Sequence, residues 1–263
     1  MDVDTLGAAT SEKTTPRIDD RDRLMIDVRG LTKTFTLYHH GGARLAVLDA
    51  IDLQVAAGEC VVLRGASGVG KSSVLRCLYG NYLVQSGEIQ VRGADGWVDV
   101  VSAPARRILE LRRCHLGHVS QFLRAIPRVP AEQVVARAAM GAGTPAEAAL
   151  EGARATLARL NISENLWHLP PATFSGGEQQ RVNVACAFAR DFPVLLLDEP
   201  TASLDAANRH VVVELVNAAR ARGAAIVGIF HDPRVREAVA TRCFDLPSKA
   251  ETVSGTACAA SER

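Results

Sequence analysis

The sequence predicts an α/β protein in which a parallel β-sheet is flanked by helices and interrupted by one inserted helical segment. Three short apolar runs indicate strands of the sheet, at 60–65, 194–200 and 224–232. Apolar and polar residues do not alternate within these runs, which is typical of strands covered on both faces. Helical patterns lie between the runs, and strands that alternate with helices favour a parallel sheet.

The composition is that of an ordinary globular protein. The chain has 263 residues, of which 48% are hydrophobic and 22% charged, and its formal net charge is +1. A charge so close to zero argues against a nucleic-acid partner. No apolar run approaches the roughly 20 residues of a membrane helix. The six cysteines include no C-x-x-C pair, so we expect a reduced, cytoplasmic protein without zinc or disulfides.

The chain is predicted to form one domain at 24–247 between two tails. Residues 1–23 carry charge without apolar periodicity, and 248–263 have the same character, so we expect a disordered and a flexible tail. The stretch at about 122–174 is rich in alanine and shows no strong strand pattern beyond its start. Thr144, Pro145 and Glu147 form a helix start within it. We therefore expect a helical subdomain inserted there.

A glycine-rich turn follows the first strand and matches G-x-x-x-x-G-K-[ST], a motif that requires a strand before it and a helix after it. The glycines let the main chain approach phosphate oxygens, and the helix start directs N–H groups at them. Lys71 can reach the β- and γ-phosphates, and the hydroxyl of Ser72 can bind Mg²⁺. The predicted phosphate-binding residues are Gly65, Ala66, Ser67, Gly68, Val69, Gly70, Lys71, Ser72 and Ser73.

The apolar run at 194–200 ends in two carboxylates, Asp198 and Glu199. The carboxyl ends of strands are where open α/β sheets bind ligands. Asp198 is well placed to hold magnesium through water, and Glu199 to polarise an attacking water.

A second glycine pair lies about a hundred residues after the first turn, in the stretch FSGGEQQRV. Ser175, Gly176 and Gly177 precede a helix with apolar residues on one face. The amino end of a helix attracts anions, so we expect a second anion site there. Further on, Asp205 suits the cap of the next helix and Gly223 its end.

Together these motifs resemble the ATP-binding-cassette (ABC) ATPases, over roughly 24–246. The LSGGQ signature of that family stands here as FSGGEQ, with Glu178 in place of the first glutamine. The resemblance implies a P-loop NTPase fold of the ABC type, with an antiparallel β region beside the parallel core. It also implies ATP hydrolysis with ATP and Mg²⁺ as cofactors. In that family the signature contacts the nucleotide of a second cassette subunit, which here is a second copy or a sister cassette protein.

The resemblance assigns roles to further residues. It implies that Gln121 contacts magnesium and senses the coupled partner, and that His231 contacts the γ-phosphate and steadies Glu199. Phe35 is implied to stack on adenine, with Tyr38 as the runner-up. Ser203, Leu204 and Asp205 match the loop that lies across the dimer from the phosphate site. The implied catalytic residues are Lys71, Gln121, Glu199 and His231; the metal-binding residues are Ser72, Gln121 and Asp198; and Phe35, Ser175, Gly176, Gly177 and Asp205 join the phosphate loop in binding nucleotide.

Less general stretches, such as 37–48 and 166–183, resemble the ATPase subunits of bacterial carbon–phosphorus lyase systems, which degrade phosphonates. That resemblance implies a soluble lyase core complex as the partner. The alternative is the ATPase subunit of a membrane transporter, either a phosphonate importer or a lipoprotein-type exporter. Both classes share every ATP motif, so only the partner separates them. We expect the partner to contact 122–135.

Overall fold

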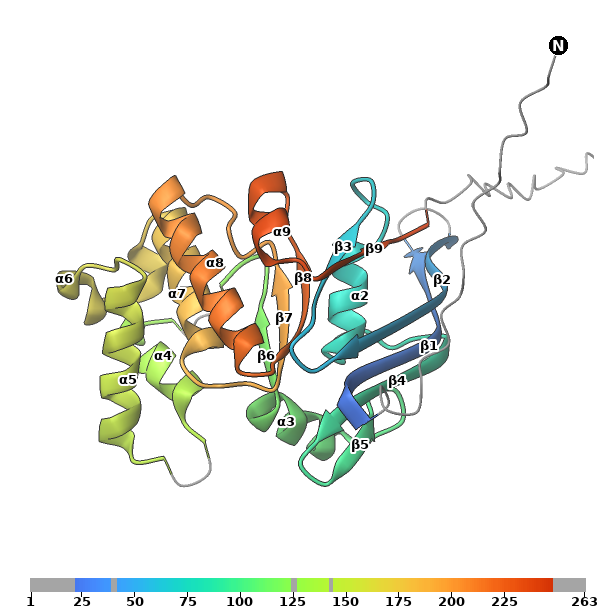
Figure 1. The fold of residues 1–263 in the computed structure, drawn as a ribbon, viewed down its shortest axis with the longest axis horizontal. Coiled ribbons are helices and arrows are strands. Elements are labelled where there is room, and N and C mark those ends of the chain that lie inside the picture. The colour runs from blue at the N-terminus through green and yellow to red at the C-terminus, as the bar shows by residue number, and fades with distance from the viewer. Residues whose placement is uncertain (1–21, 39–41, 124–126, 142–143, 248–263) are drawn as a thin grey trace, which may run out of the picture.

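The computed structural model describes residues 22–38, 42–123, 127–141 and 144–247 (Figure 1). Of the predicted tails, 1–21 and 248–263 lie outside the described residues. The described part contains a parallel sheet, an antiparallel sheet and helices around them, and this confirms the predicted fold class.

A five-stranded parallel sheet with the order β6–β7–β8–β3–β9 forms the centre of the domain. Its strands are β3 (Cys60–Arg64), β6 (Leu116–Val119), β7 (Val194–Asp198), β8 (Ala225–Ile229) and β9 (Arg242–Asp245). Every residue of β7 and β8 is buried. Leu195 and Leu197 belong to one hydrophobic core, whereas Val194 and Leu196 belong to a second core on the opposite face. The unbroken apolar runs therefore reflect two buried faces, as predicted.

Helices cover the two faces of this sheet. The core on one face includes residues of α7 (Gly176–Phe188), α8 (Ala206–Ala221) and α9 (Pro233–Val239). The core on the other face includes residues of α2 (Lys71–Leu78) and α3 (Ala105–Cys114). The end of α8 agrees with the predicted stop, because Gly223 lies just beyond it with φ +97°. None of the described helices is both long and apolar enough to cross a membrane.

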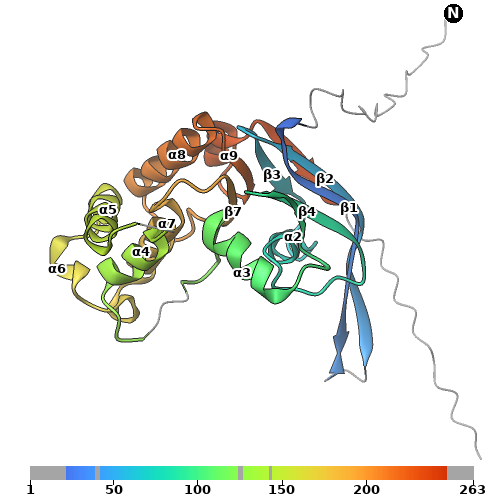
Figure 2. The same ribbon diagram turned by 90° about the horizontal axis from the view of Figure 1, so that it is seen from below.

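An antiparallel sheet with the order β2–β1–β4–β5 packs over the α2 side. Its strands are β1 (Leu24–Leu37), β2 (Ala43–Ala56), β4 (Ser86–Gly93) and β5 (Gly96–Asp99). Buried residues of this sheet share one core with α2 and with the facing side of the parallel sheet. Figure 2 shows that the far end of the β1–β2 hairpin extends away from the rest of the domain.

Three helices and one 3₁₀ turn lie within the segment predicted to be helical: α4 (Ala131–Ala139), α5 (Ala146–Arg159), α6 (Glu164–Trp167) and η2 (Pro171–Thr173). The buried carboxylate of Glu132 joins them, because it accepts hydrogen bonds from Arg154 Nε and pairs with His168 Nδ1, both at 2.8 Å. Burial raises the pKa of Glu132, but these two partners outweigh burial and hold it below its usual range.

The predicted start of α5 was wrong in one detail. The helix begins at Ala146, and Pro145 rather than Thr144 is the residue before it. The hydroxyl of Thr144 instead accepts a hydrogen bond from the main-chain N–H of Gly141, at 3.2 Å. A threonine side chain can bond equally well to a nearby turn, so the local pattern did not separate the two uses.

Candidate active site

The loop after β3 leads directly into α2 at the carboxyl edge of the parallel sheet. Gly70 immediately precedes α2 and has φ +108°. A Cβ atom on Gly70 would lie 2.9 Å from Val47 Cγ1 and 3.0 Å from the Val47 carbonyl oxygen, so both conformation and space require glycine. No described side chain caps the start of α2. The first N–H groups of this helix are therefore suited to bind an anion.

Lys71 lies across the same loop. Its Nζ atom donates hydrogen bonds to the carbonyl oxygens of Gly65 and Ala66, both at 2.8 Å. These bonds hold the ammonium group beside the loop, where phosphate oxygens could replace the carbonyl groups as its acceptors. Among the other predicted phosphate-binding residues, Ser67 and Gly68 are exposed, Val69 is buried and Ser73 is half-buried.

Ser72 and Asp198 meet although they are 126 positions apart in the sequence. The hydroxyl of Ser72 donates a hydrogen bond to Asp198 Oδ1 at 3.0 Å. Asp198 is only 2% exposed. Burial raises the pKa of this carboxyl, and the hydrogen bond from Ser72 lowers it in part. A hydroxyl beside a carboxylate supplies oxygen ligands of the kind that Mg²⁺ prefers, so the pair fits the predicted metal site.

Glu199 and His231 form a second contact at the same edge. His231 Nε2 lies 2.7 Å from Glu199 Oε1. Glu199 has φ +54°, which is uncommon for a residue with a side chain and marks a constrained position. Its main-chain N–H donates to the carbonyl oxygen of Ile229 at 3.1 Å, which ties the residue to the end of β8. The structure thus brings together the two residues that the sequence paired.

A pocket of about 270 Å³ opens beside this pair. Arg209 and Asp232, which also line it, form an ion pair with Arg209 Nη1 2.7 Å from Asp232 Oδ2. Asp232 also caps α9 by accepting from the N–H of Arg234 at 2.9 Å, so the residue next to His231 is held from two sides. Neither Arg209 nor Asp232 was predicted from the sequence as a site residue. The Asp-Pro pair after the strand is a local signal for the cap of α9, whereas no local pattern points to its partner Arg209 on α8.

Ser175 begins α7 with a capping box. Its hydroxyl oxygen accepts from the N–H of Glu178 at 3.4 Å, and the Glu178 carboxylate accepts from the N–H of Ser175 at 2.9 Å. Hydrogen bonds from Ser175 also hold the pKa of Glu178 below its usual range. Glutamate is a favoured residue at this position of a capping box. Glutamine is favoured there too, so the departure from it keeps the start of the helix capped.

The loop before α8 lies beside the start of α7. A Cβ atom on Gly177 would come within 3.0 Å of the Ser203 carbonyl oxygen, and Ser203 has φ +60°. Asp205 caps α8 as expected, because its Oδ1 atom accepts from the N–H of Asn208 at 2.8 Å. These hydrogen bonds keep the pKa of Asp205 below its usual range. The start of α7 and the loop at Ser203 therefore lie on one surface, although they come from different parts of the sequence.

Gln121 is exposed two residues after the end of β6, and the adjacent Phe122 exposes 74% of its surface. Residues 124–126 of the predicted partner-binding segment lie outside the described residues. An exposed aromatic beside a polar loop is a common feature of protein interfaces.

Phe35 contacts other residues of this chain. Its ring lies edge-on to that of Tyr82, with 5.2 Å between centroids, and Lys33 Nζ lies 4.6 Å from the Phe35 centroid. Tyr38, the runner-up, exposes 83% of its surface near the end of the β1–β2 hairpin. Stacking of either ring on adenine stays a prediction.

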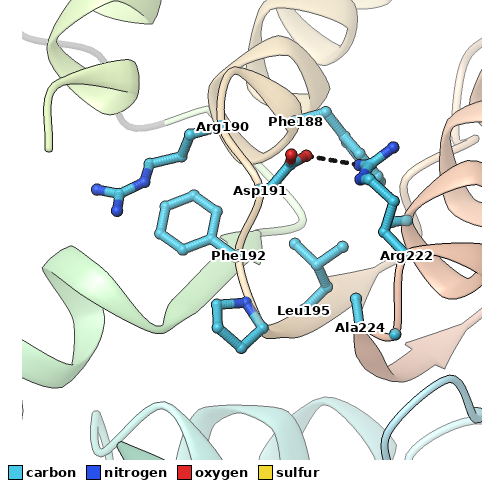
Figure 3. A pocket seen from close by; sticks show the side chains of 10 residues that line it. Phe188, Arg190, Asp191, Phe192, Leu195, Arg222 and Ala224 are labelled. Atoms are coloured by element: carbon cyan, nitrogen blue, oxygen red, sulfur yellow. Dashed lines mark ion pairs between the residues drawn. The ribbon is translucent and has the colours of Figure 1, made fainter. Parts of the chain in front are cut away.

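A second pocket, of about 200 Å³, lies at the opposite edge of the sheet (Figure 3). Phe192 borders it, and the guanidinium of Arg190 lies 5.0 Å from the ring centroid. Across the pocket Asp191 forms an ion pair with Arg222 at 2.8 Å. This pocket adjoins the start of β7, whereas Asp198 and Glu199 lie at its end. It is therefore separate from the residues that could bind phosphate.

Comparison with known proteins decides the family. A family model described as ABC transporter matches residues 48–202. The chain belongs to the ABC transporter family. Two solved structures, both dimeric structures of the cassette MJ0796, share 26% identity with it, with a TM-score of 0.76, and each match covers 84% of this chain and 94% of that one. One of them is a post-hydrolysis state bound to ADP and Pi. This ABC cassette is accordingly an ATP hydrolase.

Several curated relatives of this ABC cassette are longer than it is. A probable export ATP-binding/permease protein of Pseudomonas fluorescens is 34% identical over 211 residues, which cover 80% of this chain and 31% of the relative. The macrolide export protein MacB of Escherichia coli is 35% identical over 198 residues, which cover 75% of this chain and 30% of MacB. An uncharacterised ABC transporter ATP-binding protein of Mycobacterium tuberculosis is 36% identical, and the match covers 82% of this chain and 64% of the relative. The chain thus spans about a third to two thirds of their lengths.

We predict that Asp198→Asn stabilises the nucleotide-free protein while lowering ATP turnover at least about 100-fold. The raised pKa means that the fold disfavours ionised Asp198, so this contribution to stability falls as pH rises through its titration range. Asparagine does not ionise, so the variant does not lose stability in this way. Its advantage in melting temperature should therefore grow as pH rises above about 4, the ordinary pKa of an aspartate. A variant less stable than the parent at neutral pH would contradict this assignment.

We predict that Glu199→Gln lowers kcat by about 10²- to 10⁴-fold, because the amide cannot accept a proton from the attacking water. Binding of ATP, measured by equilibrium titration, should change little. Glu214→Gln on α8 is the matched control, since Glu214 is exposed and lies outside the residues described above. Parental turnover in the Glu199 variant would exclude the proposed role.

Proposed function

We propose that this chain is the ATP-hydrolysing subunit of a membrane export transporter and works as a pair of copies on the cytoplasmic side of the membrane. The relatives named as export ATP-binding/permease proteins support a transport role. They favour the transport alternative over the lyase interpretation. The membrane-spanning part would then belong to another polypeptide or to a further part of this one.

The site supports hydrolysis through a positioned water. Lys71 binds the β- and γ-phosphates, and the N–H groups at the start of α2 bind the same oxygens. Ser72, Asp198 and Gln121 would hold Mg²⁺, which neutralises phosphate charge when it is bound. Glu199 accepts the proton of the attacking water, and His231, 2.7 Å from its carboxylate, holds that carboxylate in place.

A second copy would complete the site. The start of α7 is exposed at Ser175 and Gly176, and α7 covers the face of the sheet opposite to α2. The N–H groups of Gly176 and Gly177, which the capping box does not use, would bind the phosphates of another chain. The dimeric structures of MJ0796 support this arrangement. The partner would be a second copy of this chain, with a sister cassette as the alternative.

The carbon–phosphorus lyase core remains the second candidate partner, supported by the sequence stretches at 37–48 and 166–183. Under either interpretation the exposed loop at Gln121 and Phe122 is the surface that contacts the partner. The ATP site is the same in both, so the test must identify the partner itself.

Affinity purification of the tagged chain from detergent-solubilised native cells tests this proposal. We expect integral membrane chains of an exporter to be recovered at about one per ATPase copy or per pair. Phe122→Asp should reduce that recovery, while ATP turnover of the isolated chain stays near the parental value. Leu169→Asp is the matched control, because Leu169 is also an exposed apolar residue but lies outside 122–135. Recovery of soluble lyase subunits without membrane chains would overturn the transport proposal.

A further inference from the structure

Two buried amides on α7 have no role in the site as described so far. Gln180 is 6% exposed and Asn183 is 4% exposed. They lie three positions apart on the helix, so both point from the same face. Buried polar side chains usually have hydrogen-bond partners. The partners of these two are main-chain carbonyl oxygens at the candidate active site.

Gln180 holds the main chain of the proposed general base. Its Nε2 atom donates a hydrogen bond to the carbonyl oxygen of Glu199, at 3.1 Å. The same carbonyl accepts from the N–H of Ala202, also at 3.1 Å. Because Glu199 has φ +54°, its conformation depends on contacts of this kind to outweigh the strain.

Asn183 binds the loop that follows β6. Its Nδ2 atom donates to the carbonyl oxygen of Ser120 at 2.6 Å, and it also lies 3.4 Å from Gln180 Oε1. Ser120 immediately precedes Gln121. A continuous set of hydrogen bonds therefore runs from the main chain beside Gln121, through both amides, to the main chain of Glu199.

We infer that Gln180 and Asn183 are positioning residues for ATP hydrolysis, which fix the main chain of Glu199 relative to the loop at Ser120 and Gln121. Neither amide touches the carboxylate that accepts the proton, so their effect passes through the main chain. Both belong to the helix that starts at Ser175, so a shift of α7 would move the base and the loop together. These roles rest on the proposed function of Glu199 in ATP hydrolysis and do not depend on the identity of the partner.

A merely structural role is the competing explanation, and it predicts a different pattern. Loss of a buried hydrogen bond lowers stability wherever the bond lies. Loss of a positioning bond also lowers kcat, with little change in the KM for ATP, because binding uses the phosphate loop. Asn217 on α8 offers a matched control, since its Nδ2 atom also donates to a main-chain carbonyl oxygen, that of Ala238 at 3.2 Å, away from Glu199.

The experiment compares Gln180→Met, Asn183→Leu and Asn217→Leu in the full chain, with kcat, KM and melting temperature measured for each. We expect kcat to fall about tenfold in the first two and less than about twofold in the third, with KM near the parental value throughout. The Gln180→Met, Asn183→Leu double variant should lose little more than either single variant, because residues that act as a unit are not additive.

Parental kcat in a folded Gln180→Met protein would overturn the inference, and so would an equal loss in Asn217→Leu. If the methionine variant does not fold, Gln180→Ala, which leaves room for a water, takes its place. An unchanged kcat in that folded alanine variant would overturn the inference as well.

Discussion

The parallel pairing of β8 with both β3 and β7 is the constraint on which the site depends. Strand β3 pairs with β8 through Val62 and Gly228, and β7 pairs with β8 up to Asp198 and Ile229. Parallel strands present their carboxyl ends at one edge. The phosphate loop, the two carboxylates and His231 therefore meet there, although they come from distant parts of the sequence. The hydrophobic cores on both faces of the sheet hold these strands in place.

The same edge contains features that oppose folding. Asp198 is buried with a raised pKa, and Glu199 has a positive φ. Both would be unfavourable in a domain selected for stability alone. Hydrogen bonds with Ser72, Gln180 and Ile229 compensate in part. Unfavourable local features held in place by their surroundings are typical of active sites, where position matters more than local stability.

The fold class and the central site residues could be predicted because their signals are local. The phosphate loop at 65–72 and the carboxylates after an apolar run each fit within a few residues, and the glycines report steric needs directly. Gln180, Asn183 and Arg209 could not be predicted, since glutamine, asparagine and arginine on a helix look like solvated residues. Their partners, at Glu199, Ser120 and Asp232, come near them only when the sheet is assembled. The partner leaves no trace in the ATP motifs, so the sequence stretches could indicate a lyase core while the relatives favour an exporter.

The central claim is that each ATP lies between two copies of the chain, with the phosphate loop from one and the Ser175 helix start from the other. Mixing Lys71→Ala chains with Ser175→Arg chains tests it, because each variant alone has no intact site. Mixed pairs would hold one site with both defects and one with neither. ATP turnover of an equal mixture should then recover to about a quarter of the parental value, since half of the pairs are mixed. A mixture as inactive as its separate components would contradict the shared site.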